Sequence, residues 1–390
     1  MRTDLLARSL AINGLVLALL LAACSDGSDA EPTLVPTGTQ APAATATTVP
    51  TLVPTVVTPN TAPSLAIELP DGFTAFQIGQ GFAQPTSVAL APDGTIYVAL
   101  RNDGVLQLRD NDGDGVYEQN VTFLPKFNST GEHAEITGVV VSDDNRVYIA
   151  DRGRITIAED FDGDGVADDI RLIIIGLPVG RHQADGLEFG PDGLLYITNG
   201  STCDECVEVD ERAATIMTAN PDGSGLTVYA TGLRNPYDIA FDSQGRLWAT
   251  DNGSDGLDAP FCETIDELNL IEQGADYGWP YAPDCDPLLS GTPPVASLGL
   301  HTASTGIDAY DGAQFPAEYV NDLFLTLWGS FAFEPELAPE LYRYTPGDDE
   351  IVLFASGFEH PIDVLMDHDG SLLVLDYGLG ALFRIVYTGS

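Results

Sequence analysis

Four of the five histidines in this 390-residue chain stand one to three residues before a short apolar segment: His133, His182, His301 and His360. Two further apolar segments are preceded in the same way by Gln84 and by Arg234 with Asn235. Imidazole titrates near neutral pH, so it can take a proton from a substrate hydroxyl, and neutral imidazoles can also bind a metal. A single histidine at such a place is more often an ordinary loop residue, but the repetition predicts one shared polar site.

Two acidic motifs point to a second kind of chemistry. The stretches "DNDGDGVYE" at 110–118 and "DFDGDGVAD" at 160–168 share the pattern D-x-D-G-D-G-x-x-[DE]. Closely spaced carboxylates, with glycines that permit a tight turn, suit a hard cation that takes many oxygen ligands. We therefore expect two structural calcium sites rather than two solvated acidic turns. The expected ligands are Asp110, Asp112, Asp114, the Val116 carbonyl and Glu118, and in the second loop Asp160, Asp162, Asp164, the Val166 carbonyl and Asp168.

The elements that must position these residues repeat along the chain. Each of six segments combines a short apolar strand, a turn that usually carries Asp-Gly or Asn-Arg, and a second apolar strand, which are hairpin signals. The segments begin at Pro85, Ile136, Ala184, Pro236, Ser304 and Pro361. Their spacing of about 50 residues is the period of a four-stranded blade, so the sequence predicts an all-β, six-bladed β-propeller. A β-sandwich is the competing fold, but sandwich strands do not recur as near-identical phrases.

The predicted propeller explains how distant polar residues could meet. We expect the first strand of each segment to be the innermost strand of its blade, so that the residues before it line one mouth of the central channel. The segment "FTAFQIGQGF" from Phe73 precedes the first copy, and we expect it to add an outer strand to the last blade and close the ring. The fifth histidine, His368, falls in a turn and is expected at the surface.

The chain is strongly acidic, which excludes some partners. It has 59 Asp and Glu against 15 Lys and Arg, a formal net charge of −44, and Lys126 as its one lysine. A surface of this charge repels nucleic acid and anionic lipid, so neither is an expected partner.

The N-terminal residues predict export and anchoring. Arg2 and Arg8 precede the apolar run "LVLALLLAA", which is short for a membrane span and is typical of a signal peptide. The following "LAAC" resembles the bacterial lipoprotein box, in which the cysteine, here Cys24, is lipidated; a plain secretory signal is the alternative. We therefore expect a lipoprotein signal peptide (1–23), a disordered Thr/Pro/Ala-rich stalk (24–65) and the propeller (66–390), in an extracytoplasmic, lipid-anchored protein.

Four further cysteines are expected to form disulfides, because an exported protein meets an oxidising environment. The preferred pairing is Cys203 with Cys206 and Cys262 with Cys285, among three possible pairings. The alternative for "CDEC" is a redox or zinc motif, although the chain has no second C-x-x-C to complete a four-thiolate site.

The block from His182 to Trp279 resembles the glucose/sorbosone dehydrogenase family of quinoproteins. The matching stretches are "HQADGLEFGPDGLLYITNGS", "GLRNPYDIAFDSQGRLWATDNG", "DELNLIEQGADYGWPY" and, more weakly, "GFEHPIDVLMDHDGSLLVLD". "CDEC" followed by "NPDGSG" is similar to the sorbosone branch of the family. The resemblance covers essentially the whole predicted propeller, and it implies a six-bladed fold that uses pyrroloquinoline quinone (PQQ) and calcium.

The resemblance also implies roles for individual residues. His182 matches the general base that removes the substrate hydroxyl proton while hydride passes to the quinone. Arg234 and Asn235 match residues that contact the quinone, and the backbone carbonyls of Gly253 and Ser254 match ligands of the cofactor's calcium. His133 falls about where the glucose branch has a polar active-site residue.

The sequence departs from the family where cations hold the carboxylates of the cofactor. The lysine of the glucose branch falls near Ser330, and its two arginines fall near His360 and Ile362, none of which is a lysine or an arginine. This leaves Arg234 and Arg181 as the strong cations expected near the mouth.

These observations favour an extracytoplasmic quinoprotein-type dehydrogenase that oxidises a sugar or a related alcohol or aldehyde, with a carbohydrate as its small-molecule partner. One alternative is a metal-dependent lyase or hydrolase, with a metal held at the mouth by His133, His182, His301 and His360. Another alternative is a non-catalytic binding propeller at the cell surface.

Overall fold

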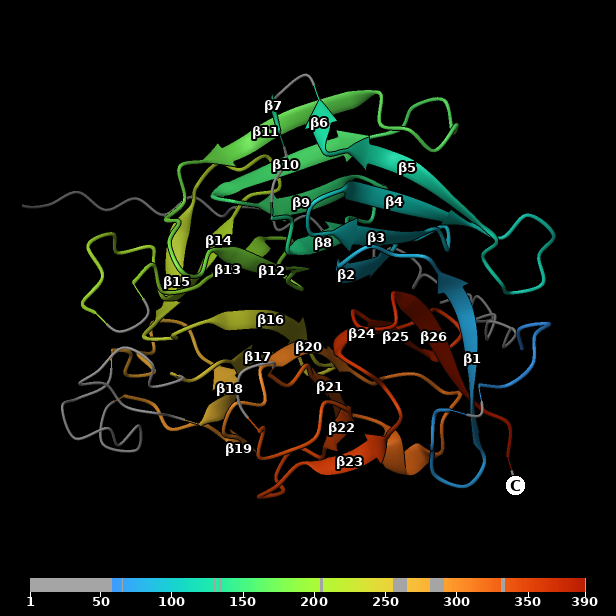
Figure 1. Ribbon diagram of the computed structural model, residues 1–390. Helices are drawn as coiled ribbons and strands as arrows, with labels where there is room; N and C mark the ends of the chain where they lie inside the picture. The colour runs from blue at the N-terminus through green and yellow to red at the C-terminus, as the bar shows by residue number, and fades with distance from the viewer. Residues whose placement is uncertain are drawn as a thin grey trace, which may run out of the picture. The chain divides into compact units, whose positions relative to one another are not determined.

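Six four-stranded antiparallel sheets make up the described part of the protein. The computed structural model describes residues 58–64, 66–128, 131–132, 135–203, 206–254, 265–280, 291–330 and 334–389, all of which belong to the unit Leu52–Ser390. The six sheets form a ring with one inner strand each at the centre, so the predicted six-bladed propeller is confirmed (Figure 1).

The blades follow one another along the chain, and blades 1 to 5 each run outward from the inner strand. Blade 1 contains β2 (Pro85–Leu90), β3 (Ile96–Leu100), β4 (Gly104–Arg109) and β5 (Gln119–Pro125). Blade 2 contains β8 (Gly138–Val141), β9 (Val147–Asp151), β10 (Arg154–Glu159) and β11 (Asp169–Ile175). Blade 3 contains β12 (Ala184–Phe189), β13 (Leu195–Asn199), β14 (Thr215–Ala219) and β15 (Thr227–Thr231).

The second half of the ring has the same order. Blade 4 contains β16 (Pro236–Phe241), β17 (Leu247–Asp251), β18 (Asp266–Ile271) and β19 (Ala296–Gly299). Blade 5 contains β20 (Ser304–Ala309), β21 (Leu323–Leu327), β22 (Leu341–Tyr344) and β23 (Val352–Ala355). Blade 6 contains β24 (Pro361–Met366), β25 (Leu372–Asp376), β26 (Ala381–Tyr387) and β1 (Phe73–Gln80).

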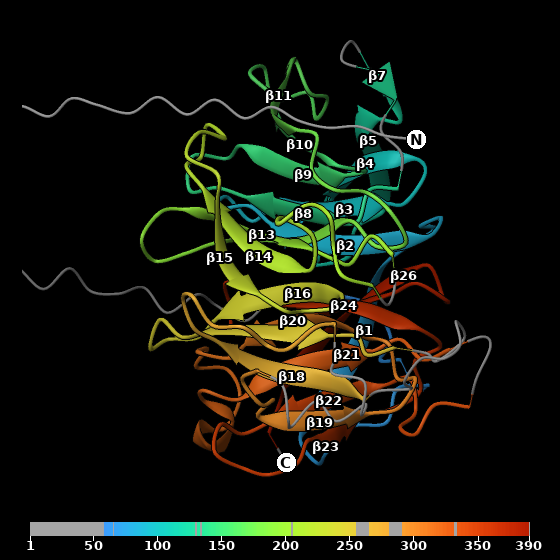
Figure 2. The same ribbon diagram turned by 90° about the vertical axis from the view of Figure 1, so that its left-hand side faces the viewer.

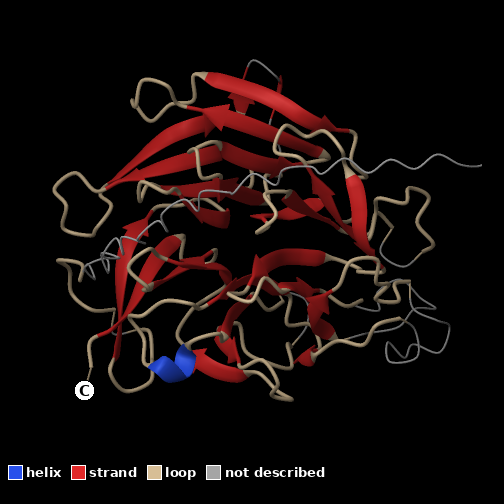
Figure 3. Ribbon diagram, turned by 180° about the vertical axis from the view of Figure 1, so that it is seen from behind, coloured by secondary structure: helices blue, strands red, loops and turns tan. Residues whose placement is uncertain are grey.

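Opposite blades can be followed in the figures. Blade 1 and blade 4 lie across the ring centre from each other in Figure 1, and Figure 2 shows blade 2 and blade 5 on opposite sides. Two short elements lie outside the blades: the hairpin of β6 (Phe127–Asn128) and β7 (Gly131–Glu132), and the 3₁₀ turn η2 (Ala317–Tyr319), which is visible in Figure 3.

The inner hairpins form because their turns carry residues that tolerate a left-handed backbone. In blade 1, Gly94 has φ +89°, which costs glycine little, and the Asp93 carboxylate accepts the backbone N–H of Thr95 at 2.9 Å. In blade 2, Asn145 takes the left-handed place with φ +62°. These turns let the two flanking apolar strands pair and become buried.

The ring closes through strand β1, as the sequence predicted. β1 pairs antiparallel with β26, with Phe73 opposite Tyr387, and supplies the outer strand of blade 6. The Phe73 ring packs edge-on against Phe315 and Phe354, with centroid distances of 4.7 and 5.2 Å. Buried aromatic rings of this kind stabilise the closure between blades 5 and 6.

Carboxylates on the inner strands join one blade to the next. The Asp363 carboxylate accepts the N–H of Val88 at 2.7 Å and joins blade 6 to blade 1, and Asp308 accepts the N–H of Met366 at 2.6 Å and joins blade 5 to blade 6. A cavity of about 220 Å³ lies in this part of the channel, and its lining includes Glu188, Asp238, Asp308 and Asp363.

The residues before the first strand bear on the predicted stalk. Asn60 and Ser64 fall inside the segment assigned to the stalk, yet their N–H groups donate to the carbonyls of Asp114 and Ala75 at 2.9 and 2.8 Å. The predicted signal peptide and Cys24 lie outside the described residues. Within the described ranges, no helix is long and apolar enough to span a membrane.

Candidate active site

A cavity of about 680 Å³ opens at the mouth of the channel where the sequence placed the site. All six blades and the loops before them contribute to its lining, including Thr86, Thr137, Asp185, Tyr237, Thr305 and Ile362. Among the residues predicted from the sequence, the cavity brings together His182, Arg234, Asn235, Gly253, Ser254 and His301.

Two other predicted mouth residues contact the cavity lining without belonging to it. The side-chain amide of Gln84 donates to the Tyr377 hydroxyl at 3.0 Å, and His360 stacks on Trp328 with a centroid distance of 4.6 Å. Tyr377 and Trp328 line the cavity, whereas Gln84 and His360 do not. These two residues therefore support the aromatic part of the wall. His133 lies outside the described residues.

His182 is held at the cavity wall by backbone contacts and close packing. Its N–H donates to the carbonyl of Ser201 at 3.1 Å, which ties the loop before β12 to the end of the neighbouring strand β13. A Cβ atom on Gly200 would lie 2.5 Å from the His182 Cβ and 2.6 Å from Asn235 Oδ1. Glycine at this position therefore lets His182 and Asn235 pack side by side.

Arg234 and Asn235 are fixed by one buried carboxylate. Asp251, at the end of β17, accepts the N–H of Arg234 at 3.0 Å and that of Asn235 at 2.6 Å. Burial raises the pKa of Asp251 to about 7, although these N–H donors and the Arg234 charge act in the opposite direction. The Asn235 Oδ1 atom is buried, and it has no hydrogen-bond partner among the described residues. It is therefore an available acceptor at the cavity wall.

Gly253 and Ser254 form the adjacent part of the wall. The Gly253 N–H donates to Asp266 Oδ1 at 2.8 Å, and the Thr302 hydroxyl donates to Asp266 Oδ2 at 2.7 Å. Burial raises the pKa of Asp266, which also lines the cavity. The carbonyls of Gly253 and Ser254, predicted as ligands of a cofactor calcium, thus lie beside a buried carboxyl group. Carbonyl and carboxylate oxygens are the ligands that calcium prefers.

The cavity contains more cations than the sequence indicated. Arg101, after β3, and Arg152, after β9, line it together with Arg181 and Arg234, so the expectation of only the last two was wrong. The prediction considered only residues before each inner strand. Because the first two strands of a blade are antiparallel, the end of the second strand lies at the same mouth as the start of the first. Arg101 and Arg152 could have been predicted by also considering the residues that follow each second strand.

Asp185 is a buried carboxyl group that the sequence analysis also missed. It lies on the inner strand β12, three residues after His182, and it lines the cavity. Burial raises its pKa to about 7, while the Thr137 hydroxyl and the Arg101 charge lower it. A carboxyl group with such a pKa can exchange protons near neutral pH. The sequence signal for Asp185 was an acidic residue within a strand expected to be buried.

Backbone strain is concentrated around this mouth. Gln84, Glu135, His301 and Ala303 have φ values of 53°, 55°, 56° and 47°, which are left-handed conformations that cost residues other than glycine free energy. Glu135, His301 and Ala303 line the cavity directly. Strain of this kind persists where the surrounding structure fixes the backbone, and it is typical of functional sites.

The two acidic loops occupy equivalent outer hairpins. The first lies between β4 and β5 of blade 1, and the second lies between β10 and β11 of blade 2. In the first loop Asp110 accepts the N–H groups of Gly113 and Gly115 at 2.7 and 2.8 Å, and Asp160 makes the corresponding bonds at 2.8 Å each. The same local sequence therefore folds into the same turn in both blades.

The carboxylates converge in both loops, although less completely in the second. Asp110, Asp112, Asp114 and Glu118 each offer an oxygen within 4.8 Å of the others. The pKa of Asp112 is raised, chiefly by the charge of Asp114, as expected for acidic groups crowded without a cation. In the second loop the converging set is Asp160, Asp162 and Asp168, without Asp164. Among the described residues, the sets that could hold a metal contain no histidine.

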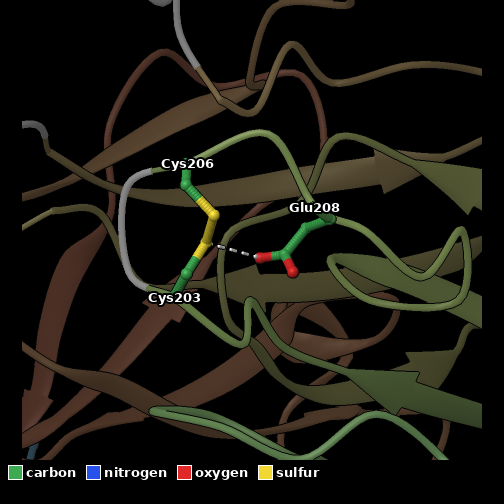
Figure 4. Close-up of side chains that lie close together, drawn as sticks. All are labelled: Cys203, Cys206 and Glu208. Carbon is green, nitrogen blue, oxygen red and sulfur yellow. Dashed lines mark hydrogen bonds between the residues drawn. A yellow bond between two sulfur atoms is a disulfide. The ribbon is translucent and has the colours of Figure 1, made fainter.

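One of the two predicted disulfides is present. Cys203 and Cys206 are bonded, so their sulfur atoms are not thiolate ligands for zinc, and Cys262 and Cys285 lie outside the described residues. Figure 4 shows the Glu208 carboxylate beside Cys203, with a contact of 3.3 Å. Glu208 also accepts the hydroxyl of Ser201 at 2.6 Å. The disulfide loop thus braces Ser201, whose carbonyl holds the His182 backbone.

The fold and its cavity define a six-bladed propeller similar to the PQQ-dependent soluble glucose dehydrogenases. The PQQ-bound aldose sugar dehydrogenase of Streptomyces coelicolor superposes with a TM-score of 0.62 at 20% identity, over 83% of this chain and 99% of that one. Identity at this level establishes a shared fold.

Sequence comparison places the chain within a family. Residues 99–328 match the family described as domain of unknown function (DUF7133), and the chain belongs to this family. An uncharacterized protein of Borreliella burgdorferi is 27% identical over 209 residues, which cover 45% of this chain and 53% of that protein. The chain thus spans about half the length of that relative. Quinoprotein glucose dehydrogenase B of Acinetobacter calcoaceticus is 28% identical over 141 residues, 28% of each chain.

Proposed function

We propose that this protein is an extracytoplasmic dehydrogenase that oxidises a hydroxyl or aldehyde group of a sugar or related compound with PQQ and calcium. The observation that carries the proposal is the mouth cavity, which places His182 and Arg234 with Asn235 on adjoining walls, among four arginines. The similarity to the Acinetobacter quinoprotein and to the Streptomyces sugar dehydrogenase supports the same chemistry.

The cavity fits the cofactor in size and charge. PQQ is a flat tricarboxylate, so its site needs volume, fixed cations and polar groups at the ring edge. The cavity has about 680 Å³, and Arg181 and Arg234 supply guanidinium groups from blades 3 and 4, where the buried Asn235 Oδ1 is an available acceptor. Ser330 and Ile362, where the glucose branch has basic residues, also line the cavity without adding charge. The cations available to the cofactor thus come from blades 3 and 4 rather than from blades 5 and 6.

Each residue then has a defined task. Arg234 and Asn235 would hold the cofactor on the blade 4 wall, and the carbonyls of Gly253 and Ser254, with Asp266, would hold its calcium. His182 would take the proton from the substrate hydroxyl as general base, and its rigid backbone contact with Ser201 keeps the imidazole in place. The bound quinone would supply the acceptor for the hydride that leaves the same carbon.

The test is reconstitution of the purified protein with PQQ and calcium, followed by dye reduction in the presence of sugars. We expect sugar-dependent dye reduction, and we expect His182→Ala to lower kcat by about 10²–10⁴-fold. His368→Ala is the matched control, because His368 lies in the turn between β24 and β25 and does not line the cavity. Absence of PQQ binding would reject the proposal, and sugar binding without turnover would favour a binding propeller.

We further propose calcium in the two outer hairpins and lipid anchoring at Cys24. The converging carboxylates in blades 1 and 2 support the first proposal. The apolar run before "LAAC" supports the second. Mass spectrometry of the mature N-terminus tests the anchor, since a lipidated Cys24 as first residue is expected, and a chain that begins at any other residue contradicts it.

A further inference from the structure

The sign of the charge reverses at the mouth cavity. The whole chain has 15 Lys and Arg against 59 Asp and Glu. The cavity lining has four arginines against three acidic residues, Glu135, Asp185 and Asp266. Burial raises the pKa of Asp185, which reduces its negative charge near neutral pH. A positive cavity on an acidic protein attracts an anionic ligand.

Two of these arginines form a distinct pair around one carboxylate. Arg152 Nη1 lies 2.9 Å from Glu135 Oε2, and Arg101 Nη2 lies 3.9 Å from Glu135 Oε1. We call Arg101, Glu135 and Arg152 the arginine clasp. About half of each arginine side chain is exposed, 49% and 51%. Two guanidinium groups and one carboxylate together have a net charge of +1. The arginine clasp can therefore neutralise the carboxylate of a ligand.

The backbone of the arginine clasp is fixed on three sides. Gln183, next to His182, donates its side-chain amide to the Glu135 carbonyl at 2.9 Å. The Arg101 N–H donates to the Gln84 carbonyl, and the Arg101 carbonyl accepts the N–H of Ile136, both at 3.0 Å. Glu135 itself has a left-handed backbone with φ 55°. The clasp is therefore a preorganised part of the wall that carries His182.

The arginine clasp lies on a different wall from the residues assigned to the cofactor. Arg101 and Arg152 follow strands of blades 1 and 2, whereas Arg234 and Asn235 precede the inner strand of blade 4. Blade 1 and blade 4 face each other across the ring (Figure 1). The arginine clasp and Arg234 thus reach the cavity from different blades, so the substrate and the cofactor can be held by different arginines.

We propose that the arginine clasp binds the carboxylate of an acidic carbohydrate, which makes a sugar acid the substrate class of this site. Planar guanidinium groups recognise carboxylates through paired hydrogen bonds, and a neutral sugar offers no such partner. The choice of substrate class rests on the proposed dehydrogenase function, whereas the binding of the carboxylate does not. The carboxylates of PQQ are the other source of the same chemistry, and the experiment separates the two.

The experiment compares D-glucuronate with D-glucose, which share a ring and differ in the carboxylate. Calorimetric titration of the full protein should show glucuronate binding at least tenfold tighter than glucose. Arg101→Gln and Arg152→Gln should each raise the glucuronate Kd about tenfold, and change the Kd of glucose and of PQQ by less than twofold. Arg171→Gln is the matched control, because Arg171 is also half exposed and paired with acidic residues, but lies on β11 outside the cavity.

Several outcomes would overturn the proposal. Glucuronate that binds no more tightly than glucose, or fails to bind, rejects the arginine clasp as a substrate site. A loss of PQQ affinity in the clasp variants, with glucuronate binding unchanged, assigns the clasp to the cofactor instead. If the protein oxidises glucose but shows no preference for glucuronate, the clasp proposal fails and the dehydrogenase stands. If glucuronate binding depends on the clasp but no quinone-dependent oxidation occurs, the clasp proposal stands and the dehydrogenase fails.

Discussion

Replacement of Asp308 by asparagine should make the stability of the propeller, relative to the wild type, rise from acidic to alkaline pH. Asp308 lies on the inner strand β20, where its two carboxylate oxygens accept the N–H groups of Ala309 and Met366 at 2.7 and 2.6 Å. Burial of the carboxyl group inside the channel raises the pKa of Asp308 from 3.8 to about 6. Asparagine cannot ionise, and because its amide nitrogen cannot accept a backbone N–H, it loses one of these two hydrogen bonds at every pH.

The magnitude follows from linkage between protonation and folding. Because the pKa is raised in the folded state, the stabilising contribution is fully present below about pH 4 and is lost as the pH rises through about 6. A shift of about two units, at 1.36 kcal/mol per unit, corresponds to about 3 kcal/mol. The Asp308 charge also raises the pKa of Asp363, so its removal acts in the same direction at the neighbouring group.

Urea unfolding at pH 4 and pH 8 measures the effect. Relative to the wild type, the free energy of unfolding of Asp308→Asn should be about 3 kcal/mol higher at pH 8 than at pH 4. Asp143→Asn is the control, since Asp143 is exposed in the β8–β9 turn and its replacement should have the same effect at both pH values. An equal difference at the two pH values for Asp308→Asn would refute the reasoning.

Two further predictions concern the site and the acidic loops. Gly200→Ala should lower dye reduction at least tenfold while the protein stays folded, because the new Cβ displaces His182 and Asn235; full activity at unchanged thermal stability would contradict the packing argument. Calcium should raise the melting temperature, with about 2.7 kcal/mol of stabilisation at 100 times the Kd, and Asp110→Asn or Asp160→Asn should each reduce that rise; a rise of the same size in these variants would show that the loops do not bind calcium.

Much of the fold could be predicted because the propeller is periodic. The blades repeat one hairpin with related turn residues in most copies, so the segments that begin at Pro85, Ala184, Pro236, Ser304 and Pro361 coincide with the starts of their inner strands. The closing strand β1 could be predicted because the last repeat supplies too few strands to complete its own blade, and the segment before the first repeat can supply the missing outer strand. Among the described residues, the short hairpin of β6 and β7 occurs in one blade alone, so a search for repeats could not reveal it.

The site was less predictable, because the lining depends on side-chain directions. Gln84 and His360 occupy the predicted places in their blades, but the cavity is lined by the residues they contact, Tyr377 and Trp328. Arg101 and Arg152 line the cavity although they follow second strands, and a pattern search that starts from first strands omits them. A sequence repeat thus predicts where the backbone of a residue lies. It does not predict whether the side chain of that residue lines the cavity, which also depends on the size of its neighbours.

The closure of blade 6 by β1 has a consequence for how the chain folds. The pairing partners Phe73 and Tyr387 lie at opposite ends of the described chain, so the ring cannot be completed until the ribosome has released the last strand. Until then, β1 and the inner face of blade 1 remain uncovered, and an exposed apolar strand of this kind invites pairing with another nascent chain. Truncation after β25 should therefore give a protein that self-associates during synthesis, rather than a smaller soluble ring.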